Sequence, residues 1–337
     1  MKAVRVEADG SVSVVDVETP SIGPGDALMR TAAAGICGSD LLDWYVRAKA
    51  GSVLGHEVAG EIVDVGPGVE GFAAGDRIVP HHHAACGKCA ACESGRSVHC
   101  REWRASSLDP GGMAELVRIP AENLSRDTSK VPPSISHEEA TFVEPLATVV
   151  KAFRRGGFTS SQSFLAVGAG STGQLAIRLA KSLGALRIGA ADPVDSRREA
   201  AEGSGATEIF GVSARPLSQT VRDPFDFVFV GPGKAPVIEA ALASVGRGGT
   251  LLAFTMAAPE ERLALSPNEL YFREVAIVPS YSAGPGDMRE ALALIASRRV
   301  EVADLVTHRF PIARAREAFE RARDPHGSMK VLLTFEG

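Results

Sequence analysis

The sequence predicts an α/β protein with a β-rich first half followed by a doubly wound parallel sheet. Three observations lead to this prediction. A length of 337 residues favours about two domains. Short alternating apolar runs fill residues 1–150, whereas apolar strands alternate with helical segments after residue 151. A glycine-rich turn then joins the first strand of the second half to its first helix, which is typical of nucleotide-binding sheets.

Composition and charge exclude several classes of function. Hydrophobic residues make up 45% of the chain, charged residues make up 23%, and the net charge is -5 without any run of Lys and Arg, so we expect no nucleic-acid partner. The first residues lack the apolar stretch of a signal peptide, and no segment approaches about eighteen consecutive apolar residues. We therefore expect a cytoplasmic protein without a membrane span.

The first half consists of strands joined by turns. The expected strands cover residues 3–6, 12–17, 27–34, 58–65 and 77–79. Short strands separated by glycine-containing turns indicate a β-barrel or β-sandwich.

Four of the five cysteines lie within one short segment. Cys86, Cys89, Cys92 and Cys100 follow the pattern C-x2-C-x2-C-x7-C, which predicts a tetrahedral zinc site. A ferredoxin-type cluster would need a shorter last gap followed by proline, whereas Arg101 follows here. Since four thiolates leave no open position on the metal, we expect this zinc to hold a loop in place and to perform no chemistry.

A second set of candidate metal ligands is scattered along the chain. Cys37 lies in a G-I-C-G-S-D motif, His56 precedes Glu57, and Glu144 lies in an apolar run. An isolated cysteine is more often a packed side chain than a ligand. A buried carboxylate, however, needs a cation beside it. Cys37, His56 and Glu144 could therefore form a catalytic zinc set with one open position.

Three consecutive histidines, His81, His82 and His83, precede the cysteine segment. Adjacent residues of a strand point to opposite faces, so three neighbours on a strand do not share one zinc site. We therefore expect one of them to line the active cleft rather than to bind a metal directly. Packing at the end of a strand is the alternative.

The second half alternates strands and helices. We expect strands over 163–167, 186–191, 208–212, 225–230, 250–254 and 275–278, and helices over 172–183 and 235–245. A further helix is expected to begin with Asp287 as its cap. The last expected strands, 306–310 and 330–335, are predicted to return to the first domain.

Gly168, Gly170 and Gly173 form a G-x-G-x-x-G motif that follows a strand and opens a helix, with Ser171 and Thr172 in its second gap. The first glycine makes the tight turn, and the second lets the backbone approach a pyrophosphate at the helix N-terminus. The third lets the helix pack closely on the strand. The motif therefore predicts a dinucleotide cofactor.

The choice of dinucleotide depends on the end of the next strand. Asp192 ends that strand, where a carboxylate accepts hydrogen bonds from the ribose hydroxyls and repels a 2′-phosphate. This favours NAD over NADP. Arg197 and Arg198 follow closely and leave NADP open, although a solvated helix start also accounts for them.

In this order, the motifs resemble those of the zinc-dependent medium-chain alcohol dehydrogenases across nearly the whole chain. The matching segments are 35–40, 55–60, 86–100, 144–146 and 168–173. The resemblance implies a GroES-like catalytic domain over 1–150, with a structural zinc lobe at 86–100, and a Rossmann NAD-binding domain over 151–284. It also implies that the segment 285–337 returns to the catalytic domain. Glu144-Pro145 is similar to the branch of sorbitol, threonine and polyol dehydrogenases.

The resemblance also implies roles for single residues. Cys37 and His56 match the catalytic zinc ligands, and Glu144 matches a third ligand that binds directly or through water. Glu57 matches a residue that ligates zinc or exchanges with water, and Ser39 matches the hydroxyl that hydrogen-bonds the substrate oxygen. Together with the cysteine site, this implies two zinc ions per chain. Homotetramers and homodimers are the assemblies that the family suggests.

One position departs from the family pattern. Leu42 stands where many relatives have a histidine that moves the proton to solvent. Asp43, a cleft histidine or the cofactor ribose could substitute for it. Trp44, Tyr45 and Lys49 follow closely and are candidates for lining the substrate pocket, although Trp44 could also be a core residue.

We therefore expect a zinc- and NAD-dependent dehydrogenase that oxidises a secondary alcohol, such as a polyol, cyclitol, sugar or amino alcohol, to a ketone. Its partners would be a small-molecule alcohol or ketone. One alternative is a zinc-free quinone or enone reductase on the same fold, which the three ligand candidates disfavour. The other is a nucleotide-binding protein without catalytic activity.

Overall fold

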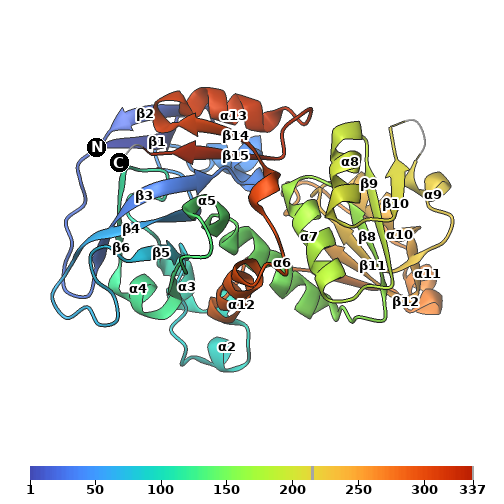
Figure 1. Cartoon of the computed structure of the whole chain (residues 1–337). Helices are drawn as coiled ribbons and strands as arrows, with labels where there is room; N and C mark the ends of the chain where they lie inside the picture. Colours follow the sequence, from blue (N-terminus) through green and yellow to red (C-terminus); the bar gives the residue numbers. More distant parts are fainter. Residues whose placement is uncertain (214–215, 336–337) are drawn as a thin grey trace.

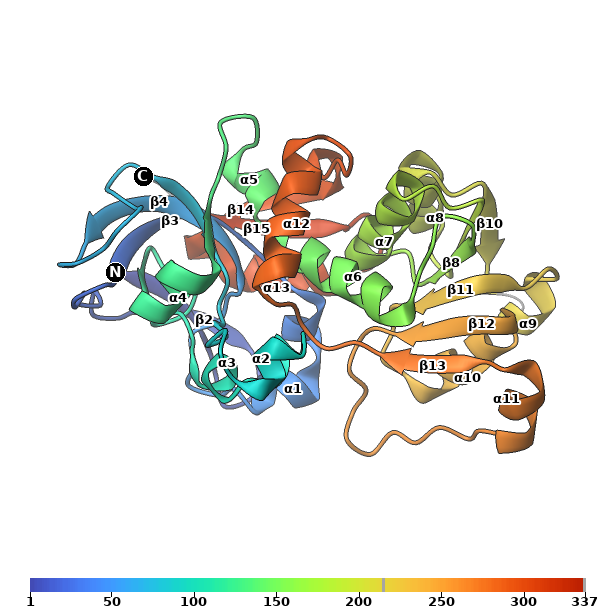
Figure 2. The ribbon, with the colours of Figure 1, turned by 90° about the horizontal axis from the view of Figure 1, so that it is seen from below.

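The computed structural model describes residues 1–213 and 216–335 (Figure 1). Residues 214–215, within the expected domain 151–284, and 336–337, at the end of the expected segment 285–337, lie outside the described part. Two sheet-centred parts lie side by side, one from the first half of the chain with the last strands and one from the middle (Figures 1 and 2).

The first part is a seven-stranded sheet beside a two-stranded hairpin. The strands of the sheet run in the order β14-β15-β3-β4-β5-β7, and β6 pairs with β3. The hairpin consists of β1 (Lys2–Val6) and β2 (Val12–Asp16). The sheet consists of β3 (Ala27–Gly35), β4 (Glu57–Val65), β5 (Arg77–Pro80), β6 (Leu116–Ile119), β7 (Thr128–Lys130), β14 (Val306–Pro311) and β15 (Lys330–Thr334).

The last strands of the chain complete this sheet. β15 pairs antiparallel with β3, with Leu332 opposite Gly35, and β14 pairs parallel with β15. Figure 1 shows the C-terminal strands in red against the blue N-terminal strands. This pairing brings Lys330 next to the end of β3, where the candidate metal ligands begin.

Short helices connect the strands of the first part. They are η1 (Gly38–Leu41), α1 (Asp43–Arg47), α2 (Ala90–Glu93), η2 (Ser97–His99), α3 (Arg101–Ala105), α4 (Ala121–Asp127) and α5 (His137–Ala140). Each is too brief for helical periodicity to reveal it in the sequence.

The second part is a parallel sheet with helices on both sides, as expected from the sequence. Its strand order is β10-β9-β8-β11-β12-β13, which is the doubly wound order 3-2-1-4-5-6. Figure 2 shows α7 and α8 on one side of the sheet and α10 on the other.

The strands are β8 (Ser163–Val167), β9 (Arg187–Asp192), β10 (Glu208–Gly211), β11 (Phe225–Val230), β12 (Val245–Ala253) and β13 (Ala276–Pro279). The helices are α7 (Ser171–Ser182), α8 (Asp195–Ser204), α9 (Leu217–Thr220), α10 (Ala235–Leu242) and α11 (Pro267–Arg273). The return to the first sheet contains α12 (Pro285–Ala296), η3 (Ala303–Leu305), η4 (Ile312–Arg314) and α13 (Ala315–Arg323).

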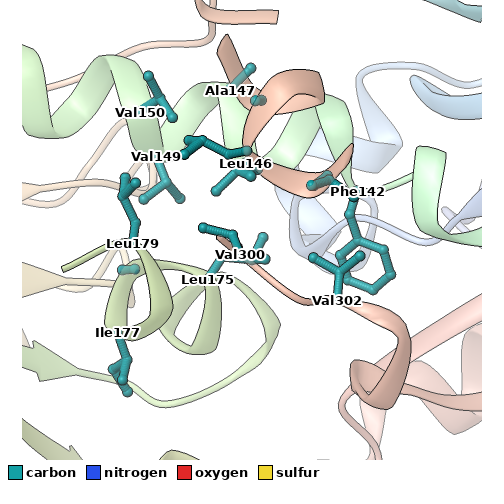
Figure 3. Packing of buried hydrophobic residues seen from close by; sticks show 14 of the residues in the cluster. Phe142, Leu146, Ala147, Val149, Val150, Leu175, Ile177, Leu179, Val300 and Val302 are labelled. Carbon is teal, nitrogen blue, oxygen red and sulfur yellow. The ribbon is translucent and has the colours of Figure 1, made fainter. Parts of the chain in front are cut away.

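Helix α6 (Val143–Gly156) connects the two parts and lies in a shared hydrophobic core. Leu146 and Val149 face Leu175 and Leu179 of α7, while Val300 lies beside them (Figure 3). Burying a side chain of this size stabilises the fold by about 1.5–3 kcal/mol. The helix therefore holds its first turn, which carries Glu144, in a defined place.

One expected cap was wrong. Helix α12 begins at Pro285 with Gly284 as its N-cap, so Asp287 lies in the first turn and not at the cap. The Asp287 carboxylate still satisfies the helix start, because its Oδ2 accepts the Gly284 N–H at 2.8 Å. Proline fits the first helical position because its fixed φ matches the helix and it has no N–H to satisfy.

Among the described helices, none is both long and apolar enough to cross a membrane. The limits of the expected domains, at residues 150 and 284, stay a prediction.

Candidate metal and nucleotide site

Cys37 lies where β3 ends and the chain turns into η1. Its backbone N–H donates to Asp40 Oδ2 at 3.4 Å, which closes the turn. Asp40 is buried, and its second oxygen has no hydrogen-bond partner among the described residues. Ser39 lies half-buried on the same turn. The turn thus presents a thiol and a hydroxyl beside a buried carboxylate.

His56 lies immediately before β4, which pairs with β3. Ligand atoms of Cys37, His56 and Glu57 lie within 4.8 Å of one another. Burial acts to lower the pKa of His56, but the Cys37, Asp40 and Glu144 groups outweigh it and raise that pKa well above its usual value. Acidic groups therefore surround His56, and such a pocket attracts a cation.

Glu57 has a protein partner of its own. Its carboxylate forms an ion pair with Lys330 of β15, and the two side chains are only 2% and 3% exposed. Lys330 Nζ also donates to the Ile36 carbonyl at 3.2 Å. Gly35 makes room for this pair, because a Cβ there would lie 2.7 Å from Lys330 Cε. A metal ligand role for Glu57 would have to compete with Lys330.

Glu144 lies beside the group of Cys37, His56 and Glu57 but belongs to a second group of possible metal ligands. Its ligand atom lies within 4.8 Å of ring nitrogens of His81 and His82. The rings of His82 and His56 are 5.2 Å apart between centroids, so the two groups are neighbours. Burial raises the pKa of Glu144, and the nearby His56 opposes that rise. The expected set of Cys37, His56 and Glu144 is thus brought together as two adjoining groups.

A zinc ion fits this donor set. Thiolate, imidazole and carboxylate are its usual ligands, and catalytic zinc sites use three protein ligands. A divalent cation would neutralise the acidic groups around His56, whereas the positive charge of Lys330 is paired with Glu57.

The four cysteines of the lobe converge. All are free thiols, and their sulfurs lie within 4.8 Å of one another. The Sγ–Sγ distances are 3.9 Å for Cys86–Cys92 and 3.6 Å for Cys89–Cys92. Zinc–sulfur bonds of about 2.3 Å in a tetrahedron put sulfurs about 3.8 Å apart, so zinc fits this site as well.

The pKa values of these thiols also indicate that a cation is needed to ionise all four of them. Burial, together with the Cys89 thiol, raises the pKa of Cys92 to about 12. Burial opposes ionisation of Cys100 too, but backbone N–H groups of Cys86 and Trp103 lower its pKa to about 6. Without a metal, the four thiols would not all ionise near neutral pH, whereas zinc binds them as thiolates.

Aromatic side chains extend from the lobe toward the candidate metal groups. The Trp103 ring lies 4.0 Å from that of His83, and Tyr281 meets Trp103 edge-on at 5.7 Å. His83 Nδ1 donates to the Ser106 carbonyl at 2.7 Å. These contacts join the lobe to the segment that precedes α12.

The residues around α1 are the candidates for the substrate pocket and for the proton relay. Lys49 Nζ lies 4.2 Å above the Tyr45 ring, and the Trp44 ring meets that of Tyr45 edge-on. Asp43 is exposed and forms an ion pair with Arg323 at 3.1 Å. Asp43 is therefore a poorer substitute for the missing relay histidine than a cleft histidine or the cofactor ribose.

The glycine-rich loop has the geometry of a phosphate site. Gly168 has φ +91°, a conformation that side-chain-bearing residues rarely adopt, and a Cβ at Gly173 would collide with the Gly168 carbonyl. Gly170 caps α7, and Ser171 and Thr172 form its first turn. The loop therefore presents backbone N–H groups to a ligand at the start of a twelve-residue helix.

Asp192 ends β9 beside this loop. Its two oxygens accept the Ala169 and Val194 N–H groups, each at 2.8 Å. The Arg198 side chain is engaged elsewhere than at the glycine-rich loop. It donates to the backbone carbonyl of Asp192 and forms an ion pair with Asp195. Arg197 lies over the loop instead, 3.7 Å from the place a Gly170 Cβ would take.

Three residues of the site were assigned no role from the sequence. Asp40 carried a signal, because it lies within the motif that contains Cys37. Lys330 and Asp127 carried none. Lys330 reaches Glu57 across 273 residues, and Asp127 pairs with His81 from the end of α4.

Comparisons with known proteins agree with this geometry. Residues 23–133 match the alcohol dehydrogenase GroES-like domain family, and residues 171–297 match the zinc-binding dehydrogenase family. D-altritol 5-dehydrogenase of Agrobacterium fabrum is 32% identical over 345 residues, covering 100% of both chains. L-threonine 3-dehydrogenase of Pyrococcus horikoshii is 37% identical over 220 residues, covering 63% of this chain and 62% of its own.

A solved structure extends the match to three dimensions. The alcohol dehydrogenase TADH of Thermus sp. ATN1 superposes with a TM-score of 0.86 at 30% identity, covering 100% of both chains. Both the β-rich GroES-like part and the Rossmann part are thereby confirmed. The chain therefore belongs to the zinc-dependent medium-chain alcohol dehydrogenases, in the branch that contains polyol and threonine dehydrogenases.

Proposed function

We propose that this protein is a dehydrogenase that oxidises a secondary alcohol to a ketone and transfers the hydride to NAD. The observation that carries the proposal is the convergence of the half-buried Cys37 and His56 with the buried Glu57, and with Glu144 beside them, on one pocket lined by acidic groups. A protein that only binds nucleotides has no need for such a pocket.

The proposed catalytic zinc ligands are Cys37, His56 and Glu144. Glu144 is preferred to Glu57 as the third ligand, because Glu57 is already neutralised by Lys330, whereas the Glu144 carboxylate makes no hydrogen bond or ion pair within the described residues. Zinc, when bound, supplies a Lewis acid that lowers the pKa of an alcohol hydroxyl. Ser39 would hydrogen-bond the substrate oxygen from the turn that carries Cys37.

The proposed cofactor is NAD, bound with its pyrophosphate at Gly168–Gly173. Two backbone N–H groups hold the Asp192 carboxylate at the end of β9, where it would repel a 2′-phosphate. Arg197 lies over the glycine-rich loop that would hold the pyrophosphate. The carboxylate of Asp192 makes NADP the less favoured cofactor. We propose a second, structural zinc at Cys86, Cys89, Cys92 and Cys100.

The substrate class follows from the relatives. The names of the two relatives above give a polyol and an amino acid bearing a secondary hydroxyl as substrates of those proteins. We propose a polyol, cyclitol, sugar or amino alcohol for this chain.

We further propose a cytoplasmic homodimer or homotetramer in which residues 1–150 and 285–337 form the catalytic domain and 151–284 bind the cofactor. The free cysteines suit a reducing compartment. Self-association is supported by β13, an edge strand of its sheet, next to which Tyr271 and Phe272 of α11 are 76% and 66% exposed.

An activity panel tests the proposed function. The zinc-loaded protein is incubated with polyols, cyclitols, sugars, amino alcohols and simple secondary alcohols, with NAD and with NADP, and reduced cofactor is measured by absorbance. We expect oxidation of at least one class, and faster oxidation with NAD. Reduction of enones or quinones without any alcohol oxidation would contradict the proposal, and so would NAD binding without turnover.

A further inference from the structure

His81 and His82 do not lie on a strand. Strand β5 ends at Pro80, and the chain bends at His82. Adjacent side chains point to opposite faces only in an extended strand. The expectation that these neighbouring histidines cannot share one metal site therefore does not hold here. Both instead direct a ring nitrogen to within 4.8 Å of a Glu144 oxygen.

His81 is held rigidly with one nitrogen free. Its Nδ1 lies 2.7 Å from Asp127 Oδ2, its backbone N–H donates to the Asp127 carbonyl at 2.9 Å, and Asn123 donates to its carbonyl at 3.0 Å. Its Nε2 is buried and has no partner among the described residues. A histidine that binds a metal usually donates its other N–H to a carboxylate in this way.

His82 completes the set. Its Nδ1 is also buried and without a partner in the described part of the chain. Leaving a buried polar atom unsatisfied costs about 1–3 kcal/mol, so two such nitrogens, on two rings that both approach one carboxylate, require an explanation. Two imidazoles and one carboxylate form a common zinc ligand set.

We propose that His81, His82 and Glu144 form a second metal seat in the cleft, which takes a divalent cation such as zinc. The proposal deepens the proposed function and rests on it, because Glu144 serves both the Cys37 set and this seat. The shared carboxylate makes the two positions alternatives for one ion, which can pass between them. Tetrahedral zinc with bonds of about 2.0–2.1 Å places its ligand atoms about 3.4 Å apart, so these nitrogen and oxygen atoms, which lie within 4.8 Å of one another, would draw closer on binding.

Zinc content per chain tests the seat without reference to activity. The wild type is expected to hold two zinc ions, and Cys37→Ser also two, because the second seat retains the cleft ion. Combining Cys37→Ser with His82→Asn is expected to reduce the content to one. His82 is half-buried and its Nδ1 makes no hydrogen bond to any described residue, so the change removes no hydrogen bond of that nitrogen seen in this part of the chain.

Two further variants sharpen the test. His83→Asn in the Cys37→Ser background is the matched control and should leave two zinc ions, since His83 Nδ1 is engaged by Ser106 and lies outside the seat. Asp127→Asn in that background should weaken zinc affinity about 10–100-fold in a chelator competition, because Asp127 orients His81.

The outcomes separate the two proposals. A wild type with a single zinc would contradict the proposed function itself. A wild type with two zinc ions and a Cys37→Ser variant with one would contradict only the second seat. Retention of two ions by the Cys37→Ser/His82→Asn variant would also contradict the seat, since the ion would then be held without His82.

Discussion

Replacing Cys37 with serine is expected to reduce kcat/KM for alcohol oxidation by about a thousandfold or more. Lewis-acid activation by a metal is worth several kcal/mol, and each 1.36 kcal/mol corresponds to about a tenfold change in rate. A serine hydroxyl is a poor zinc ligand, so the ion would no longer be held beside His56 and Ser39. The measurement is steady-state reduction of NAD with the best substrate from the panel.

The same variant should bind NADH as the wild type does. The glycine-rich loop and Asp192 belong to the second sheet and share no hydrogen bond with Cys37. Titration of NADH fluorescence is therefore the control for folding. Full activity in Cys37→Ser would refute a catalytic role for this thiol, whereas loss of both activity and NADH binding would show that the substitution acts through the fold.

Lys330→Met is expected to lower the free energy of unfolding by about 3–5 kcal/mol, because removing one partner of a buried ion pair leaves the other charge uncompensated. Methionine matches the aliphatic part of the lysine side chain but offers Glu57 no cation. Urea titration of the zinc-loaded protein measures the change. If zinc compensated Glu57 directly, stability would be nearly unchanged, and Glu57 rather than Glu144 would become the third ligand.

Two comparisons make this result specific. Glu57→Gln combined with Lys330→Met should recover much of the loss, since no unpaired charge remains. Lys2→Met removes a surface pair with Asp16, whose side chains are 49% and 74% exposed, and should cost only about 0–1 kcal/mol. An equal loss from Lys2→Met would show that the effect of Lys330→Met does not come from burial.

Features encoded by nearby residues could be predicted from the sequence. The cysteine lobe and the glycine-rich loop each lie within a short segment, and their spacing directly reflects the geometry that the ligand needs. The alternating strands of the second half have periods that the sequence displays, and its doubly wound sheet is confirmed.

Features that depend on distant partners could not be predicted. Helix α6 was only an apolar run in the sequence, because its first turns are almost wholly buried and the exposed Arg154 and Arg155 come only in its last turn. The Lys330–Glu57 pair forms only when β15 adds to β3. The position of His81 and His82 depends on the end of β5 at Pro80, and a difference of one residue there reverses which faces they occupy.

The central claim is a catalytic zinc held by Cys37, His56 and Glu144 in addition to the zinc of the cysteine lobe. Anomalous diffraction at the zinc absorption edge, from crystals of the zinc-loaded wild type, tests it most directly. We predict two zinc peaks per chain, one among the four lobe sulfurs and one bonded to Cys37 Sγ, the His56 ring and the Glu144 carboxylate. A single peak, confined to the cysteine lobe, would contradict the account.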